Sequence, residues 1–518
     1  MRSFRIGVDV GGTHTDAVLL DDRLTCVYQV KVPTTEDVDG GIAAAVRRLM
    51  RESGVKPGRV KVAMLGTTHC TNAIVERKQL LRVGVIRIGA PATLSVPPMT
   101  GWPEDLKRAV GGQSFIVQGG REFDGRPIVP LDGEEIRAVC SQFQGVDAVA
   151  ITGVFSPAMG EDEEKAAQIV KEELGRDFPL TLSHQLAGLG LLERENAAIL
   201  NASLTGVIQS VVAGFRDALH GEDIRDARVF FGQNDGTLMT LESALHYPIR
   251  MIACGPTHSV RGAAHLAGVT EGLVVDVGGT TTDIGALTAG FPRESASPVE
   301  IGGIRTLFRM PDLLSIGIGG GTVLHRDQTA SVRLGPDSVG SRLFDEGRCF
   351  GGRTWTLTDA AAVVGRVRWA PSPPPSREEH KFCEQAYAKM VAAIEEGIDR
   401  MKGRAGAVPV LLVGGGSALL PDRLQGVNQV IRPPHHDVAN AIGAALGEVG
   451  GQIDTIVSIK EDRRDLLDEL KEQAVALAVR EGADSEKVRV VETEEVPLAY
   501  LPGRTVRVRI KAAGPLVS

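Results

Sequence analysis

One eight-residue phrase occurs twice in this sequence. It reads DVGGTHTD from Asp9 to Asp16 and DVGGTTTD from Asp276 to Asp283, and each copy lies between two short apolar runs. An apolar strand, a glycine pair and a second strand predict a β-hairpin. Because glycine has no side chain, the tip of such a hairpin lets the backbone approach a ligand and offer it N–H groups. Each copy therefore predicts a site for an anion such as phosphate.

The polar residues of the two copies extend this prediction. Threonine hydroxyls donate hydrogen bonds to phosphate oxygens, and an aspartate can hold a hydrated Mg²⁺ that bridges to phosphate. We assign catalysis and magnesium binding to Asp9 and Asp276, and the positioning of water or metal to Asp283. For Asp16 and Asp283 the alternative is a hydrogen bond that stabilises the hairpin. Phosphate contacts are expected from Gly11, Gly12, Thr13, Thr15, Gly278, Gly279, Thr280 and Thr281.

The repetition favours a function over an ordinary structural turn. Two near-identical hairpins that face each other across a cleft would hold the phosphates of a nucleotide from both sides. A third glycine-rich turn fits the same cleft. The run LLVGGGSALLP (411–421) predicts a strand that ends in Gly414, Gly415, Gly416 and Ser417, where missing Cβ atoms leave room for a flat ring and a ribose. ATP with Mg²⁺ is the expected ligand.

The segment GTTHC at residues 66–70 is the expected substrate side of the cleft. It lies where a strand should end and a helix begin, so its hydroxyl and N–H donors are available to an anion or a substrate. The substrate residues assigned here are Thr67, Thr68, His69 and Asn72. A thiol nucleophile at Cys70 or Cys254 is disfavoured, because the sequence identifies no base that would activate either cysteine.

The pattern of the whole chain predicts an α/β fold. Strand-like and helical runs alternate up to about residue 450, and the pattern that opens the chain restarts before the second copy of the phrase. We expect two tandem lobes around a cleft, over residues 1–190 and 191–450. Residues 451–518 contain a charged helical run and two strand-like runs, and they predict a small C-terminal α+β unit.

Composition argues against several classes of protein. The 518 residues carry a formal net charge of −8, which argues against a nucleic-acid-binding surface. No apolar run reaches about 18 residues, the length that spans a bilayer, so we expect no membrane segment. The six cysteines form no Cys-x-x-Cys pair, and the N-terminal residues lack a signal-peptide pattern. These features predict a cytoplasmic protein with reduced thiols.

The order of the motifs resembles the actin/Hsp70/sugar-kinase ATPase superfamily. The hairpins match its two phosphate motifs, residues 414–417 its adenosine motif, and NAIGAALG (440–447) its connecting helix. Within that superfamily the sequence most resembles the hydantoinase/oxoprolinase family, specifically its HyuA-type subunit. Segments that carry this resemblance are LGTTHCTNAIVERK (65–78), CGPTHSVRGAAHLAG (254–268) and IGIGGGTVLHRD (316–327).

The resemblance implies both a fold and an activity. The fold is two actin-like (ribonuclease H-like) ATPase domains. The activity is ATP-dependent opening of a cyclic amide, such as a hydantoin or 5-oxoproline, through phosphorylation of the amide oxygen, with a HyuB-type second subunit as partner. A small-molecule kinase and a nucleotide-gated activator or scaffold subunit are the alternatives. The chain departs from the family at CGPTHS (254–259), where Ser-Gly-Pro-Ala-Gly-Gly is usual, and at SRLFDEGRCFGG (341–352).

Overall fold

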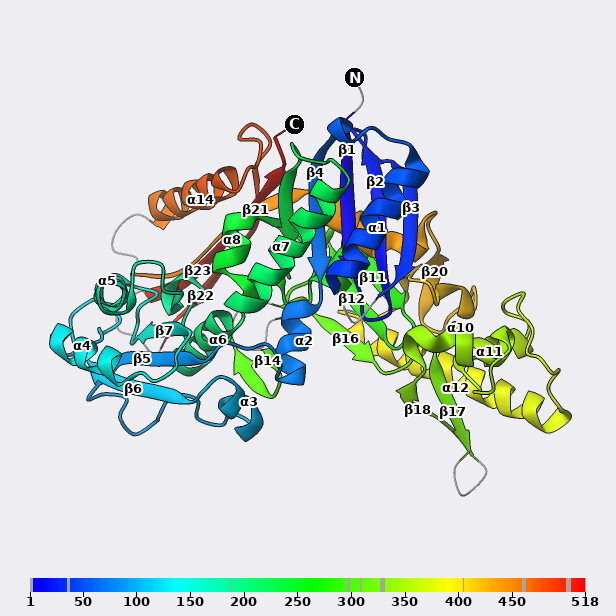
Figure 1. The fold of residues 1–518 in the computed structure, drawn as a ribbon, viewed down its shortest axis with the longest axis horizontal. Coiled ribbons are helices and arrows are strands. Elements are labelled where there is room, and N and C mark those ends of the chain that lie inside the picture. Colours follow the sequence, from blue (N-terminus) through cyan, green and yellow to red (C-terminus); the bar gives the residue numbers. More distant parts are fainter. Residues whose placement is uncertain are drawn as a thin grey trace.

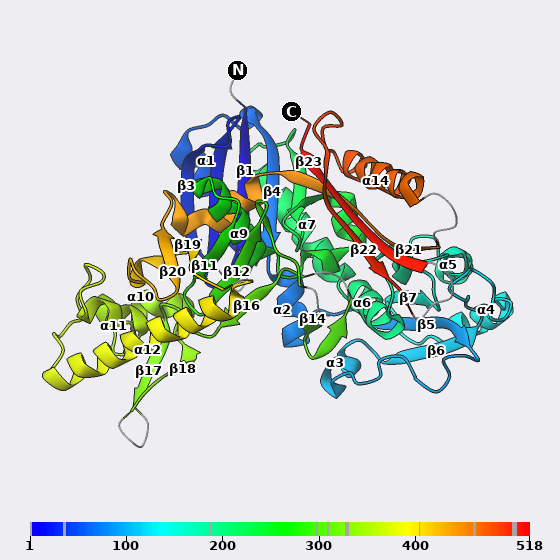
Figure 2. The same cartoon turned by 180° about the vertical axis from the view of Figure 1, so that it is seen from behind.

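The computed structural model describes residues 3–34, 38–186, 188–295, 299–307, 310–326, 331–403, 405–458, 463–499 and 505–517. Figures 1 and 2 show the N-terminal strands in the middle of the molecule. The strands of residues 83–182 lie at one end of the long axis, and the helices of residues 357–401 lie at the other.

The predicted N-terminal hairpin forms and starts the main sheet. Strand β1 (Phe4–Val10) pairs antiparallel with β2 (His14–Asp21), and β2 pairs antiparallel with β3 (Cys26–Pro33). On its other side β1 pairs parallel with β4 (Val60–Thr67), which pairs parallel with β9 (Arg228–Gly232). The order of this part of the sheet is therefore β3-β2-β1-β4-β9.

The same order recurs around the second copy of the phrase. Strand β11 (Gly272–Val277) pairs antiparallel with β12 (Thr282–Thr288), and β12 with β13 (Phe291–Pro292). Strand β19 (Val408–Val413) is parallel to β11, and β20 (Val427–Ile431) is parallel to β19. The order β13-β12-β11-β19-β20 repeats that of the first sheet, strand directions included. This repeat confirms the expected α/β class with two related actin-like lobes.

Helices cover the sheets because their apolar residues fall on one face. In α1 (Val38–Ser53), Ile42, Ala45, Val46 and Leu49 are fully buried at the spacing of one helical face. The other helices are α2 (His69–Glu76), α3 (Glu104–Ala109), α4 (Gly133–Gln142), α5 (Glu161–Leu174), α6 (Leu191–Ser203), α7 (Thr205–Gly221), α8 (Leu241–His246), α9 (Cys254–Ala267), α10 (Leu343–Glu346), α11 (Leu357–Val363), α12 (Arg377–Met401), α13 (Ala439–Ala445) and α14 (Arg463–Arg480).

Residues 83–182 form a separate parallel sheet with the order β6-β5-β7-β8. Its strands are β5 (Val83–Ala90), β6 (Gln113–Gln118), β7 (Ala148–Gly153) and β8 (Leu180–Leu182). Arg87 on β5 forms an ion pair with Glu195 on α6, and neither side chain is exposed to solvent. Because a buried charge is costly without its partner, this pair fixes the sheet against α6.

The expected C-terminal helix and two strands also form, and the strands lengthen the first sheet. Strand β21 (Glu448–Ser458) pairs with β23 (Thr505–Pro515) along its whole length, and β23 pairs with β22 (Arg489–Pro497). Strand β21 also joins β10 (Leu238–Thr240), which pairs with β9, so that the described strands of this sheet number nine. The domain boundaries at residues 190 and 450 stay predictions, and this strand pairing runs across both.

The remaining strands are short; the first two pack against α2 and α6, and the other three belong to the second lobe. They are β14 (Val299–Ile301), β15 (Ile304–Thr306), β16 (Leu313–Ile316), β17 (Thr322–Arg326) and β18 (Val332–Ser338). Strand β16 pairs antiparallel with β12, and the turn that follows it reaches the second hairpin.

Two helices connect the lobes. Helix α13 packs on β1, β2 and β4, whereas α9 packs mainly on β11, β12 and β19. The helices cross where Gly262 of α9 lies against Gly443 of α13. A Cβ at Gly262 would lie 1.8 Å from the Ala439 carbonyl oxygen, and one at Gly443 would lie 1.9 Å from the His258 carbonyl oxygen. Only glycine permits this backbone-to-backbone contact.

Within the described parts of the chain, no single helix is both long enough and apolar enough to cross a bilayer. The consecutive helices α6 and α7 pass that test of length and composition only together, with a bend of 47° between them.

Candidate functional site

Both copies of the repeated phrase line one cavity of about 420 Å³. The first hairpin contributes Gly11, Gly12, Thr13, His14 and Asp16, and the second contributes Asp276, Gly278, Gly279, Thr280 and Thr281. The hairpins approach each other closely, because a Cβ at Gly279 would lie 3.4 Å from Cγ2 of Thr13. The predicted cleft between two glycine turns is therefore present.

Backbone hydrogen bonds hold each hairpin tip in shape. The amide of Gly11 donates to the His14 carbonyl at 3.0 Å, and the amide of Gly278 donates to the Thr281 carbonyl at 2.9 Å. The second hairpin is also supported from behind by the glycine-rich turn after β16. There the amides of Gly320 and Gly321 donate to the carbonyls of the second glycine pair, at 3.0 and 2.7 Å.

Asp9 lies at the end of β1, behind the hairpin tip, and is 3% exposed. Its Oδ2 accepts a hydrogen bond from Nδ2 of Asn440 at 3.0 Å, and its Oδ1 lies 3.3 Å from Nδ1 of His258. It does not itself line the cavity. Its orientation is thus fixed by α13 on one side and by α9 on the other.

Asp276 occupies the equivalent position in the second lobe and does line the cavity. Its Oδ2 accepts a hydrogen bond from Oγ of Ser259 at 2.5 Å. Burial, together with the negative charges of Asp283 and Asp9, raises the pKa of its carboxyl group to about 6. A divalent cation beside the Asp276 carboxylate would balance this negative charge. The residues present therefore fit Mg²⁺ beside Asp276.

The last aspartate of each phrase is engaged within its own lobe. Asp16 forms an ion pair with Lys31 at 2.5 Å, and burial raises the pKa of its carboxyl group. Asp283 accepts a hydrogen bond from Oγ of Ser315 and does not line the cavity. Thr15 is fully buried beside Thr34 and does not line it either. These contacts favour the hairpin-stabilising alternative for Asp283, whose catalytic role stays a prediction.

The third glycine turn lies where the sequence placed it. Gly414, Gly415 and Gly416 all line the cavity, whereas Ser417 is fully buried beneath them. Gly414 has a φ of +83°, and a Cβ there would lie 2.1 Å from Oδ1 of Asp276. This position therefore requires glycine, and the turn brings the predicted ring-binding loop directly against the second hairpin.

The predicted substrate residues do not line this cavity. Thr67 is 1% exposed at the end of β4, with its hydroxyl against the His69 ring, and Thr68 donates to the Val10 carbonyl at 3.4 Å. The Asn72 amide donates to Thr68 at 3.5 Å. The group packs behind the first hairpin, and a substrate role for it stays a prediction.

The two cysteines beside this segment are not poised as nucleophiles. Cys70 and Cys254 are both fully buried, and burial raises the pKa of the Cys70 thiol to about 12. Burial raises the pKa of Cys254 as well. Since the thiolate is the reactive form, neither residue fits covalent catalysis.

Several lining residues were not predicted from the sequence. Lys31, Ser259 and Asn440 reach the cavity from three separate elements. An apolar wall completes it with Leu343, Phe344, Phe350, Trp369 and Leu419. The Phe350 ring lies 4.7 Å from Phe344 and 5.3 Å from Trp369, between ring centroids. Leu343, Phe344 and Phe350 of this wall lie in SRLFDEGRCFGG (341–352), one of the two segments in which the sequence departs from the family.

The repeated strand order and the cleft between paired glycine hairpins define a two-lobed fold of the actin-like class. The chain belongs to the hydantoinase/oxoprolinase family. Residues 5–174 match the family profile "Hydantoinase/oxoprolinase N-terminal region", and residues 194–398 match the profile "Hydantoinase/oxoprolinase". Together the matches cover well over half of the chain.

Two relatives are named as enzyme subunits. The chain is 26% identical over 390 residues to the caprolactamase subunit alpha of Pseudomonas jessenii, covering 70% of this chain and 55% of that subunit. It is 25% identical over 395 residues to the acetophenone carboxylase gamma subunit of Aromatoleum aromaticum, covering 70% of this chain and 53% of that one. The chain thus spans about half the length of these relatives.

Solved structures share the fold. The crystal structure of the ATP-dependent caprolactamase from Pseudomonas jessenii superposes with a TM-score of 0.77 at 19% identity, covering 98% of this chain and 87% of that one. Nucleotide-free acetone carboxylase gives a TM-score of 0.69 at 17% identity, covering 100% of this chain and 88% of that one.

Proposed function

We propose that this chain is the ATP-binding subunit of an enzyme that opens a cyclic amide. The observation that carries the proposal is the single cavity lined by both glycine hairpins and by Gly414–Gly416. Membership of the hydantoinase/oxoprolinase family and structural similarity to the ATP-dependent caprolactamase of Pseudomonas jessenii support it.

The chemistry requires activation because a planar amide is a poor electrophile. In the proposed reaction the amide oxygen takes the γ-phosphoryl group of ATP, and ADP leaves. One water then adds to the activated carbon and the C–N bond breaks, which leaves an acyl phosphate. A second water releases phosphate and the ring-opened amino acid. The protein's contribution to phosphoryl transfer is positioning and charge stabilisation.

We assign each part of this reaction to particular residues of the cavity. The amides and threonine hydroxyls of the two hairpins hold the phosphates from opposite sides. Asp276, with Asp9 behind it, would hold Mg²⁺, and the cation would supply positive charge against the phosphates. Lys31, held by Asp16, adds a positive charge at the first hairpin. The apolar wall around Phe344 and Trp369 offers flat rings against which a base or a substrate ring can stack.

A second subunit of the HyuB type is part of the proposal. Its support is that the named relatives are subunits, called alpha, beta and gamma in caprolactamase, acetone carboxylase and acetophenone carboxylase. We expect this chain to use ATP and the partner to complete the ring-opening site.

The test is ATP turnover of this chain, purified with the product of a neighbouring gene. ADP release is measured with 5-oxoproline, hydantoin and caprolactam, and with an open-chain secondary amide as the matched control. We expect one cyclic amide to raise turnover at least about tenfold, with a ring-opened product in the mass spectrum. A stable phosphorylated product would instead identify a kinase. Slow turnover that no cyclic amide changes would identify a nucleotide-gated subunit.

His258 contacts the Asp9 carboxylate, and we predict that it holds this carboxylate in the orientation that metal binding requires. The His258 ring is 1% exposed, and it packs against the paired strands β4 and β9 only because Gly66 and Gly232 lack side chains. A Cβ at Gly66 or at Gly232 would lie 2.5 or 2.1 Å from ring atoms. The Nε2 atom has no hydrogen-bond partner among the described residues, so Nδ1, facing Asp9, is the functional nitrogen.

We therefore expect His258→Asn and His258→Gln to behave differently. The asparagine amide reaches the position of Nδ1, so this variant should keep its Mg²⁺ dependence of ATP turnover within about threefold. The glutamine amide reaches the position of Nε2 instead, and we expect its apparent Mg²⁺ affinity to fall about 10- to 100-fold, as for other residues that orient metal ligands. Thermal unfolding of both variants controls for packing. Equal Mg²⁺ dependence in the two variants would contradict this role.

A further inference from the structure

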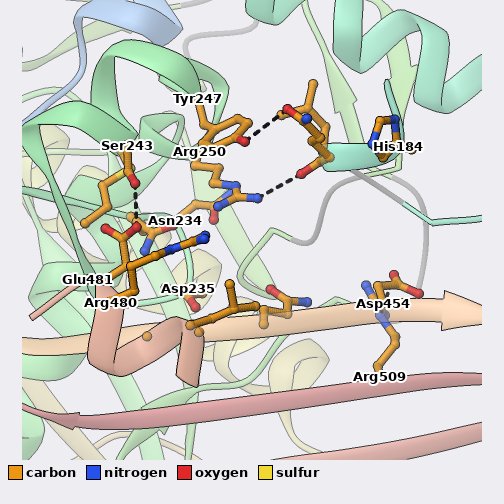
Figure 3. A pocket seen from close by; sticks show the side chains of 18 of the residues that line it. His184, Asn234, Asp235, Ser243, Tyr247, Arg250, Asp454, Arg480, Glu481 and Arg509 are labelled. Carbon is orange, nitrogen blue, oxygen red and sulfur yellow. Dashed lines mark hydrogen bonds and ion pairs between the residues drawn. The ribbon is translucent and has the colours of Figure 1, made fainter. Parts of the chain in front are cut away.

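A second cavity, of about 250 Å³, lies on the far side of the β9–β10 turn from the hairpins. Its walls come from that turn, from Tyr247 and Arg250, from β21, and from the C-terminal end of α14 (Figure 3). Gly450 and Gly451 of β21 line it without side chains. Segments far apart in the sequence thus enclose a pocket whose lining is mostly polar.

The acidic groups of this cavity are already engaged. Asp235 forms an ion pair with Lys511 at 2.8 Å, and Asp454 forms one with Arg507 at 2.6 Å. Glu481 accepts hydrogen bonds from the Thr240 amide at 3.0 Å and from Oγ of Ser243 at 2.6 Å. These carboxylates are therefore occupied by partners other than the two arginines described next.

Arg250 and Arg480 are the cationic groups that stay without a carboxylate. Arg250 lies 4.4 Å above the Tyr247 ring and donates from Nη2 to the Gln185 carbonyl at 3.1 Å. Burial lowers the pKa of its guanidinium group. Arg480 ends α14, and Figure 3 shows it projecting from the opposite wall toward Arg250. Among the described residues, neither forms an ion pair with an acidic side chain.

We propose that this cavity binds a small molecule through an oxyanion, a carboxylate or a phosphate, held between Arg250 and Arg480. An oxyanion between the two guanidinium groups would accept charge-assisted hydrogen bonds from both. The ligand is smaller than a nucleotide, because the volume is below the range of about 300–1,000 Å³ typical of sites for drug-sized molecules.

The site is distinct from the nucleotide cavity but shares a structural element with it. The Asn234 carbonyl, on the wall of this pocket, accepts a hydrogen bond from Oγ1 of Thr257 at 3.0 Å. Thr257 directly precedes His258, which contacts Asp9. The proposal depends on the arginine pair alone and stands whether or not the chain acts on a cyclic amide.

The test is calorimetric titration of the full chain with glutarate, with inorganic phosphate, and with glutaramide as the neutral analogue of glutarate. Saturating Mg-ADP is present throughout, so that anions cannot be counted at the hairpins. We expect glutarate or phosphate to bind, and glutaramide to bind at least about tenfold more weakly than glutarate. Binding of glutarate alone identifies a carboxylate ligand, and binding of phosphate alone identifies a phosphorylated one.

Arginine variants locate the binding. Arg250→Gln and Arg480→Gln should each weaken binding about tenfold or more, the effect of losing one charge-assisted hydrogen bond. Arg216→Gln, an equal charge change on the exposed face of α7, should have no effect. Because Arg480 is exposed, its variant is expected to fold even if the Arg250 variant does not. The proposal is overturned if neither anion binds, if glutarate binds but glutaramide binds equally tightly, or if Arg480→Gln binds the anion like the unaltered chain.

Discussion

Asp9→Asn and Asp276→Asn will each lower amide-stimulated ATP turnover by about 100- to 1,000-fold. Asparagine keeps the shape of the side chain, so the contacts of Asn440 and Ser259 have a partner of the same size. It removes the negative charge that a divalent cation needs, and preorganised charge of this kind is worth about 10²–10³ in rate. The measurement is ADP release at saturating substrate, over a range of Mg²⁺ concentrations.

Two further aspartates make this result specific. Asp217→Asn, on the exposed face of α7, is the matched control and should leave turnover unchanged. Asp283→Asn tests whether the last aspartate of the phrase acts in the reaction or only stabilises the hairpin through Ser315. A large loss there would support the catalytic role that the sequence suggested. If Asp9→Asn and Asp276→Asn both leave stimulated turnover intact, the assignment of the site is wrong.

Gly319→Ala will weaken the binding of Mg-ADP about tenfold or more, although Gly319 does not line the cavity. A Cβ at this position would lie 2.6 Å from the Thr280 amide nitrogen and 2.7 Å from the carbonyl carbon of Gly279. Both are backbone atoms of the second hairpin and cannot rotate away. The hairpin must shift, which costs about 1–3 kcal/mol by overpacking and moves the amides that face phosphate.

Gly317→Ala is a close control for this change. Gly317 belongs to the same turn and also lies outside the cavity, but a Cβ there would meet nothing within 4 Å. Calorimetry with Mg-ADP should show unaltered affinity for Gly317→Ala and weakened affinity for Gly319→Ala. Equal affinities would mean that the position of the second hairpin does not control nucleotide binding.

Local sequence predicted the features that repeat. The two hairpins and the glycine turn at Gly414 were predictable because each needs glycine at a fixed place after an apolar strand, and that requirement is visible in a few residues. The apposition of the hairpins also followed, since a phrase written twice suggests two halves of one site. The structure brings both copies to one cavity.

Long-range contacts could not be predicted in the same way. Lys31, Ser259 and Asn440 reach the site from a strand edge and from two helices, and no spacing connects them to the hairpins. The pairing of β21 with β10 could not be predicted either. The residues of a strand do not specify which edge of a sheet it joins, because that choice depends on the whole sheet. The departure from the family at residues 254–259 pointed to the site, since His258 contacts Asp9 and Ser259 contacts Asp276.

The crossing of α9 and α13 has a mechanical consequence. Gly262 and Gly443 place no side chain at the point of contact, so we expect this crossing to act as the hinge if the lobes rotate relative to each other. His258 and Ser259 lie on α9 less than two turns from this crossing, and Asn440 lies equally near to it on α13. Such a rotation would therefore move Phe344 and Trp369 at the outer wall of the cavity more than it moves Asp9 and Asp276. A nucleotide bound as proposed could then leave the cleft while Asp9 and Asp276 keep their contacts with α9 and α13.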